Sequence, residues 1–222
     1  MRHWLFHPLI FYPLVALAAA AVILISMKPQ DWPRPPAPVA GEIHNGMLVL
    51  QGEAFNSPEK SPEQNMTVSR DLWGHARSLH IAVLAGQPDP TPADTGVRIL
   101  LTPRSAAVLG AGAVTMEVSY RPQPVNTAAA LAVSLQGAGP ADWVKLPLQP
   151  QAGVLRFQAP PGFAPDAIGL RAISDQPGQS YGVEIVRIIA YPTRAQGAAQ
   201  APAPVASPAP PAAQTSQPAP VH

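Results

Sequence analysis

The sequence predicts a mainly β protein, an antiparallel β-sandwich of the jelly-roll type that follows one transmembrane helix and precedes a disordered tail. Three observations predict this class. Thirty of the 222 residues are proline, which breaks a helix when it lies inside it. Between residues 41 and 193, short apolar runs alternate with turn residues about every 8–12 positions, the spacing of sandwiches and barrels. Residues 9–27 form one uncharged apolar stretch.

The apolar stretch matches the roughly 20 residues that cross the core of a bilayer as a helix, so we predict a transmembrane helix over residues 9–27. The alternative is a cleaved signal peptide, because Ala16-Leu17-Ala18 resembles a small-x-small cleavage site. A cleavage site normally follows the apolar core, whereas here apolar residues continue to Ile25. This continuation favours an anchor that stays attached.

The charge pattern alone does not fix the orientation of this helix, because Arg2 lies on one side and Lys28 and Arg34 lie on the other. The N-terminal end, residues 1–8, is short, and the chain beyond the helix has the β-rich, proline-rich character of an exported domain. With no cysteine and no eukaryotic sorting signal, we expect a bacterial inner-membrane protein. Residues 1–8 would lie in the cytoplasm, the helix would contact membrane lipid, and the bulk of the chain would face the periplasm.

Two proline-rich segments flank the predicted domain. Residues 28–40 contain five prolines, which favour an extended polyproline conformation and predict a semi-rigid stalk of roughly 40 Å. Residues 194–222 consist almost entirely of Ala, Pro, Gln and Ser. Such a composition buries too little apolar surface to offset the entropy of ordering, so we expect a disordered tail.

The predicted periplasmic domain covers residues 41–193. Alternation of apolar and polar residues is cleanest over residues 114–121, which indicates a strand with one face on a core and the other in water. The candidate strands are residues 47–55, 79–84, 97–102, 114–121, 129–136, 143–149, 154–158, 168–174 and 183–191.

Several features refine this picture of the domain. Pro147 marks an edge strand, because proline cannot donate to a ladder, and residues 183–191 are apolar on both faces, which indicates a central strand. Residues 105–109 are expected to form one helical turn. The longest gap between strands, residues 56–78, is a candidate functional loop, and residues 86–96 are a second.

Composition and motifs exclude several function classes. The net charge of +1 gives no basic face for nucleic acid, and the absence of cysteine excludes disulfides and thiolate chemistry. There is no nucleophile elbow, phosphate loop or dinucleotide fingerprint. His44, His75 and His80 show no metal-like spacing. We therefore expect no catalytic residue, no cofactor and no metal ion.

Carboxylates offer no clear catalytic pair either. Glycoside hydrolysis needs two Asp or Glu side chains on facing elements. Glu53, Glu117 and Glu184 lie on predicted strands. Glu117 falls on the polar face of its strand, where an ordinary solvated charge is expected.

Trp143 is the first candidate binding residue. The alternation of the following residues turns Trp143 outward beside Lys145, on the edge strand that Pro147 marks. An outward tryptophan there can stack against an apolar sugar face or a protein partner. The alternative is a buried tryptophan covered by a loop such as residues 56–78, because tryptophan is highly buried on average.

Three further residues complete the candidate binding set. Trp73 lies among charged residues in the long loop, where it either contacts a ligand or pins the loop to the core. Arg171 and Tyr181 lie near the ends of predicted strands and could line a rim. The ordinary alternative for both is a solvated residue at a strand end.

The carboxyl half resembles galactose-binding-like jelly rolls, a group that includes many carbohydrate-binding modules. The resemblance covers residues 97–192 and rests on a tryptophan strand, a glycine-containing strand and a terminal Val-Glu-Ile-x-x-Ile strand, in residues 143–149, 167–175 and 181–188. It implies a non-catalytic sandwich that binds glycans through its loops. An obvious acidic cluster for the structural calcium of such modules is missing from this sequence.

The sequence therefore predicts a membrane-anchored periplasmic binding module without catalytic activity, whose ligand is envelope polysaccharide or peptidoglycan. The alternative is a protein-interaction accessory subunit of an inner-membrane complex, in which Trp143 or the long loop contacts another envelope protein. A hydrolase is the third and least supported reading. A sugar binder needs an aromatic ring beside convergent polar groups, an interaction subunit needs a broad apolar patch, and a hydrolase needs titratable groups converging in a pocket.

Overall fold

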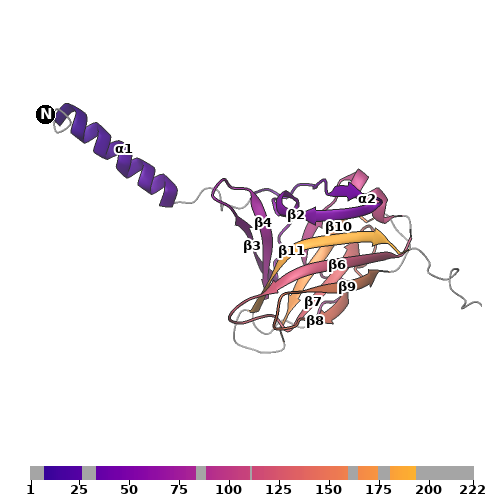
Figure 1. The fold of residues 1–222 in the computed structure, drawn as a ribbon. Coiled ribbons are helices and arrows are strands. Elements are labelled where there is room, and N and C mark those ends of the chain that lie inside the picture. The colour runs from indigo at the N-terminus through magenta and orange to yellow at the C-terminus, as the bar shows by residue number, and fades with distance from the viewer. Residues whose placement is uncertain are drawn as a thin grey trace, which may run out of the picture.

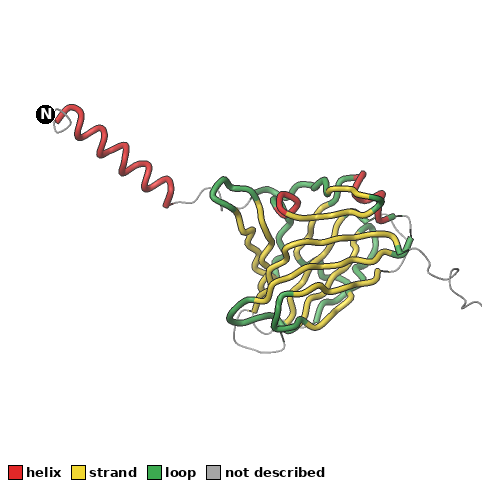
Figure 2. The backbone as a smooth tube through the Cα atoms, viewed as in Figure 1, coloured by secondary structure: helices red, strands yellow, loops and turns green. Residues whose placement is uncertain are grey.

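The computed structural model describes residues 8–26, 34–83, 89–110, 112–159, 165–174 and 181–193. It consists of an N-terminal helix, α1 (Pro8–Ser26), and a domain of two antiparallel sheets, as Figures 1 and 2 show. The predicted β-sandwich is thereby confirmed. The predicted disordered tail, residues 28–33 of the predicted stalk and Met27, the last residue of the predicted transmembrane helix, lie outside the described residues.

Helix α1 is uncharged, and its side chains are not buried in the domain. Its 19 residues are long and apolar enough to cross a membrane, a property that it shares with signal sequences. Pro13 lies inside the helix. The helix thus meets the predicted length and composition, and both the anchor and the signal-sequence interpretation remain compatible with it.

The larger sheet has seven strands and is built around the last one, β11 (Tyr181–Pro192). On one edge, β11 pairs with β6, which in turn pairs with β9. On the other edge it pairs first with β4 and then with β2, and these carry β3 and β1 respectively. The remaining bounds are β1 (Glu42–His44), β2 (Met47–Gln51), β3 (Gln64–Arg70), β4 (Ala76–Val83), β6 (Val114–Pro122) and β9 (Gly153–Ala159).

The smaller sheet has four strands in the order β5-β10-β7-β8. Its edge strand β8 contains Pro147, as the sequence predicts. The bounds are β5 (Val97–Leu100), β7 (Ala130–Gln136), β8 (Val144–Pro147) and β10 (Ala167–Ile173). A 3₁₀ helix, η3 (Gly52–Phe55), and a short helix, α2 (Pro103–Leu109), complete the described elements.

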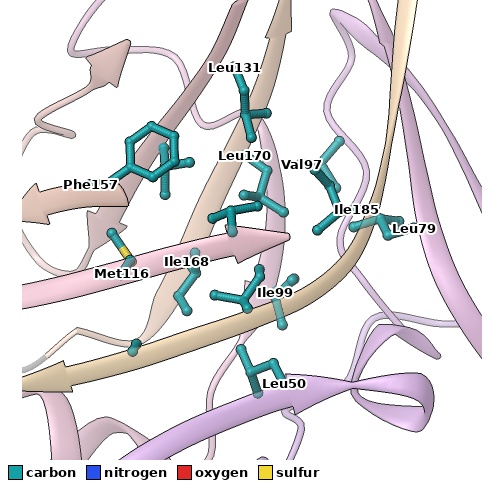
Figure 3. Packing of buried hydrophobic residues seen from close by; sticks show 14 of the residues in the cluster. Leu50, Leu79, Val97, Ile99, Met116, Leu131, Phe157, Ile168, Leu170 and Ile185 are labelled. Carbon is teal, nitrogen blue, oxygen red and sulfur yellow. The ribbon is translucent and has the colours of Figure 1, made fainter. Parts of the chain in front are cut away.

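The core lies between the two sheets, where the inward residues of the alternating strands meet (Figure 3). Met116 and Phe157 come from the larger sheet, and Leu131 and Ile168 come from the smaller one; all four are fully buried. Burial of this apolar surface is the main favourable term in folding. A core of this size stabilises a domain that has no disulfide bonds.

All nine predicted strands are present, the first only as residues 47–51, because residues 52–55 turn into η3. The predicted helical turn is the C-terminal part of α2, which Thr102 caps by accepting a hydrogen bond from the amide of Ser105. The structure adds β1 and β3. The expectation of a long loop over residues 56–78 is therefore wrong, because β3 and the start of β4 lie inside it.

The edge strand β3 escaped prediction because polar residues dominate it. Only Met66 and Val68 direct apolar side chains toward the core. Gln64 is buried, and its side chain bonds to the backbone of Ala172 in β10. The side-chain nitrogen donates to the Ala172 carbonyl at 2.8 Å, and the side-chain oxygen accepts from the Ala172 amide at 3.0 Å. This reciprocal pair ties the start of β3 to the smaller sheet.

Arg171 is a buried cation in β10 and does not line an open rim. Its side chain is 2% exposed and pairs with Asp94 at 2.9 Å and with Glu63. The Thr91 amide lowers the pKa of Asp94, and Arg171 lowers it further, against the opposing effect of burial. A buried charge is tolerated only when it is paired, so Arg171 fastens two connecting segments to the outer face of the smaller sheet.

We predict that Arg171→Met lowers the free energy of unfolding by about 2–4 kcal/mol, because it leaves two carboxylates facing an apolar surface. Lys145→Met is the matched control, since its ion pair with Asp89 is exposed and should contribute less than about 1 kcal/mol. Urea unfolding of the detergent-solubilised full chain measures both. Equal losses in the two variants would contradict the structural role of Arg171.

Candidate functional site

The outer face of the larger sheet carries an ordered array of polar side chains. Residues opposite one another in antiparallel strands point to the same face. Gln158 of β9, Thr115 of β6 and Tyr191 of β11 form one such row. In the next row, Arg156 of β9 lies opposite Glu117 of β6. Strands β9, β6 and β11 thus build one platform together with β2.

A groove of about 700 Å³ lies where this platform reaches the C-terminal end of β11. One wall is the tight turn between β1 and β2, where Asn45 and Gly46 have φ angles of +51° and +76°. Asn-Gly is favoured there because both central residues of such a hairpin turn need positive φ. The groove is lined by Asn45, Gly46, Met47, Thr115, Arg156, Gln158, Tyr191, Pro192 and Thr193.

Glu117 holds two of the lining side chains in place. Its Oε1 accepts hydrogen bonds from Arg156 Nε at 3.1 Å, from Arg156 Nη2 at 2.7 Å and from the Tyr191 hydroxyl at 3.1 Å. The hydrogen bonds from Arg156 lower the pKa of Glu117 most, and the Tyr191 bond lowers it further, although burial opposes them. Glu117 is therefore a firmly ionised anion at neutral pH.

Tyr191 is kept as a neutral hydroxyl that donates. Burial raises its pKa above the usual value of 10.0, and the hydrogen bond to the Glu117 carboxylate raises it further. At the end of the groove, the hydroxyls of Thr115 and Thr193 hydrogen-bond at 2.7 Å, and the Thr193 amide donates to the Ala113 carbonyl at 2.6 Å. These bonds fix the chain directly after Tyr191.

Three polar groups of the lining make no hydrogen bond to any described residue. They are Arg156 Nη1 and the side-chain amides of Gln158 and Asn45. Arg156 and Gln158 are both exposed. A ligand in the groove would thus find an immobilised guanidinium, two amides and the half-buried ring of Tyr191 on one surface.

Trp143 and Lys145, the first candidates from the sequence, lie on the outer face of the smaller sheet and do not line this groove. Trp143 is half-buried against Ala130, Ala132 and Ile173, and its Nε1 is buried without a hydrogen-bond partner among the described residues. Lys145 is exposed and pairs with Asp89 at 2.6 Å.

The segment that covers Trp143 differs from the expected one. Gly96 has a φ of +60°, and a Cβ atom there would lie 2.7 Å from Cη2 of the indole. Gly96, the last residue of the loop predicted over residues 86–96, therefore packs against the Trp143 indole, whereas the sequence suggests residues 56–78 as the covering segment. A bulkier residue at position 96 would collide with the indole.

The other candidates are dispersed over the domain. Trp73 does not pin a loop to the core, since it is 85% exposed in the turn between β3 and β4. Tyr181 is half-buried and packs against the core at the start of β11. Arg171 is buried in its ion pairs. Trp143 and Lys145 share one face, and the five candidates do not converge on one site.

Comparison with known proteins returns matches at the level of structure only. No family model matches the sequence, and no curated protein matches it. Among solved structures, the apo form of the CBM1 module of BiXyn10A is similar with a TM-score of 0.40 and 8% identity, over 70% of this chain and 99% of that chain. The CBM22-1 xylan-binding domain of Xyn10C from Paenibacillus barcinonensis is similar with a TM-score of 0.40 and 12% identity, over 70% and 97%.

We predict that the Glu117 network stabilises the fold in a pH-dependent way. Because the pKa of Glu117 is lowered in the folded state, its contribution is complete above the ordinary value of 4.5 and disappears as pH falls through the folded pKa. Glu117→Gln should therefore melt at a lower temperature than the wild type at pH 7, and the difference should become smaller at pH 3, which lies below the ordinary value. Thermal unfolding at the two pH values measures this, and a constant difference would contradict it.

Proposed function

We propose that this chain is a non-catalytic binding module, held at the bacterial inner membrane by α1 and facing the periplasm, whose groove binds a glycan of the cell envelope, either polysaccharide or peptidoglycan. One observation carries the proposal: Glu117 fixes Arg156 and Tyr191 side by side, while polar groups beside them have no hydrogen-bond partner among the described residues. The wider proposal on the membrane rests on the length and composition of α1.

The chemistry of the groove suits a sugar. A pyranose ring presents neighbouring hydroxyls that donate and accept, together with an apolar face of C–H groups. Arg156 offers donors, and Gln158 and Asn45 offer both donors and acceptors. The Tyr191 ring gives an apolar surface with a polar end. Because Glu117 holds two of these side chains before binding, a ligand loses less free energy in ordering them.

The same geometry argues against hydrolysis in this groove. A glycosidase of the usual kind needs two carboxyl groups, one of them protonated at working pH. The lining contains no acidic residue among those described, and Glu117, which lies directly behind it, is held as an anion by Arg156. Glu117 therefore acts as a positioning residue for Arg156 and Tyr191.

We predict that Tyr191→Ala and Arg156→Ala each weaken glycan binding by about tenfold or more, as central contacts in a binding site do. Full-length protein in nanodiscs is tested on an array of envelope polysaccharides and peptidoglycan fragments, and hits are titrated by calorimetry. Arg104→Ala, which removes an exposed arginine of α2, is the matched control and should bind as the wild type does.

Two outcomes would replace this proposal. Binding that Trp143→Ala abolishes and Tyr191→Ala leaves intact would move the site to the outer face of the smaller sheet. A blank array, together with stoichiometric recovery of another membrane protein after crosslinking, would make the chain an accessory subunit of a membrane complex.

We also predict that the mature protein retains α1. Mass spectrometry of the protein purified from membranes should find the N-terminus upstream of Leu9, and protease added to spheroplasts should digest the domain while a cytoplasmic marker survives. A mature N-terminus near Ala19 would identify residues before it as a cleaved signal peptide. Protection of the domain alongside the marker would reverse the proposed orientation.

A further inference from the structure

The turn between β3 and β4 presents two adjacent apolar side chains to solvent. Leu72 is 91% exposed and Trp73 is 85% exposed. They are the most exposed large apolar residues of the described part of the domain, and they do not line the groove described above. In Figure 1, β3 and β4 diverge from β11 toward one corner of the sandwich, and this turn forms that corner.

The turn is held rigid without help from these two side chains. Asp71 Oδ1 accepts hydrogen bonds from the Trp73 amide at 3.0 Å and from the His75 amide at 2.9 Å. The Asp71 amide donates to the His75 carbonyl at 2.9 Å, and Gly74 takes a φ of +83° that closes the turn. Arg77 binds the second oxygen of Asp71 at 3.2 Å. Leu72 and Trp73 are thus held outward by a preorganised backbone.

The turn lies beside the point where the chain from α1 joins the domain. The Ala37 amide donates to the Ser57 carbonyl at 3.2 Å. Next to Ser57, Asn56 accepts hydrogen bonds from the Arg70 guanidinium through its side chain and through its carbonyl. Arg70 also donates to the Gly74 carbonyl at 3.2 Å, inside the turn. This chain of contacts links the domain's point of entry directly to the Leu72–Trp73 corner.

The tether to α1 is short. Eleven residue steps separate Ser26, the last residue of α1, from Ala37, where the chain first bonds to the domain, and a fully extended chain spans at most about 40 Å over that distance. If α1 spans the bilayer, its end lies at the membrane interface. The corner is therefore confined near that interface, and confinement raises the effective concentration of even a weak contact.

We propose that Leu72 and Trp73 insert into the interfacial region of the same membrane, as a second contact that orients the domain on the bilayer. This inference rests on the proposed membrane span of α1. Tryptophan favours the headgroup level because one ring combines a large apolar surface with an N–H donor. The neighbouring charges offset one another, with Arg70 and Arg77 opposing Asp71 and Glu53, which binds the Ala76 amide at 3.0 Å. The contact is thus apolar and does not require anionic lipid.

The absence of cysteine makes the proposal directly testable by labelling the full chain at single introduced cysteines. His75→Cys places an environment-sensitive fluorophore on an exposed residue of the turn while leaving Leu72 and Trp73 intact. The protein is reconstituted into phosphatidylcholine vesicles that contain nitroxide-labelled lipid. Val125→Cys is the matched control, because Val125 is a 74% exposed apolar residue in the loop after β6.

The control position lies far from the turn. Asn126 accepts from the Gly182 amide, and Gly182 pairs with Ala82 near the C-terminal end of β4. The Leu72–Trp73 turn lies at the opposite end of β4, so the length of that strand, about 23 Å, separates them. Leu17→Cys, in the middle of α1, reports separately whether the helix lies in the membrane.

We expect the label at position 75 to be quenched by the lipid nitroxide at least about twice as strongly as the label at position 125, as for a group at the headgroup boundary. Replacing Leu72 and Trp73 by serine should reduce quenching at position 75 to the control level, and 1 M salt should leave it unchanged. Both substitutions lie at fully exposed positions, so the fold should persist.

Three results would overturn the proposal. Equal quenching at positions 75 and 125, with a quenched label at position 17, would show an anchored chain whose corner does not touch lipid. Quenching at position 75 that survives the double serine substitution would show proximity without insertion. An unquenched label at position 17 would show that α1 does not lie in the membrane, which is the premise of the proposal. Glycan binding at the groove is measured independently, so its failure is distinguishable from each of these.

Discussion

Strand β11 and its single register shift determine how the larger sheet presents its side chains. Up to Ile185, the odd-numbered residues of β11 face the core; from Ile188 onward, the even-numbered residues do. The pairing with β6 shifts between Ile185 and Arg187. A one-residue shift exchanges the two faces of everything beyond it. Without this bulge, Tyr191 would point into the core and Ala190 would point to solvent.

The same shift divides the partners of β11. On the edge opposite β6, β11 pairs with β4 before the shift and with β2 after it. β4 is therefore free to diverge from the sheet beyond Leu79, and it carries the Leu72–Trp73 turn to a corner of the domain. β2 continues alongside the rest of β11 and places the Asn45-Gly46 turn over Tyr191. The groove and the corner are two consequences of one irregularity in one central strand.

Regular alternation of apolar and polar residues made most of the strands predictable from the sequence. Features that depend on contacts between distant segments were not predictable. β6 alternates so cleanly that its core face could be read from the sequence. The bulge in β11 could not be predicted, because the strand carries isoleucine on both faces, at Ile185, Ile188 and Ile189. The apolar pattern therefore does not show where the inward positions change from odd-numbered to even-numbered residues. Glu117 is a solvated charge by sequence pattern, and it becomes the centre of a site only through its register with Arg156, 39 residues away. Arg171 is buried only because residues 108 and 77 positions away bring their carboxylates to it.

The two outer faces of the sandwich are suited to different tasks for the same physical reason. On the smaller sheet, the first three outward positions of β7 are the small residues Ala130, Ala132 and Ser134, so other segments pack closely on them. Trp143 covers part of this face, and the ion pairs of Arg171 hold two connecting segments across the rest. The outward positions of β6 and β9 include the long polar side chains of Arg121, Arg156 and Gln158, all of which are exposed. Because binding needs surface that is not already packed against the protein, this difference supports placing the proposed ligand on the larger sheet.

Strand β2 connects the groove to the corner. It runs from the groove at Met47 to Gln51, directly before η3, which contacts the base of the turn through Glu53. The length of β2, roughly 13 Å, thus separates the groove from η3, which lies at the base of the corner that we place on the bilayer. This arrangement suits a module that holds its ligand near the membrane surface.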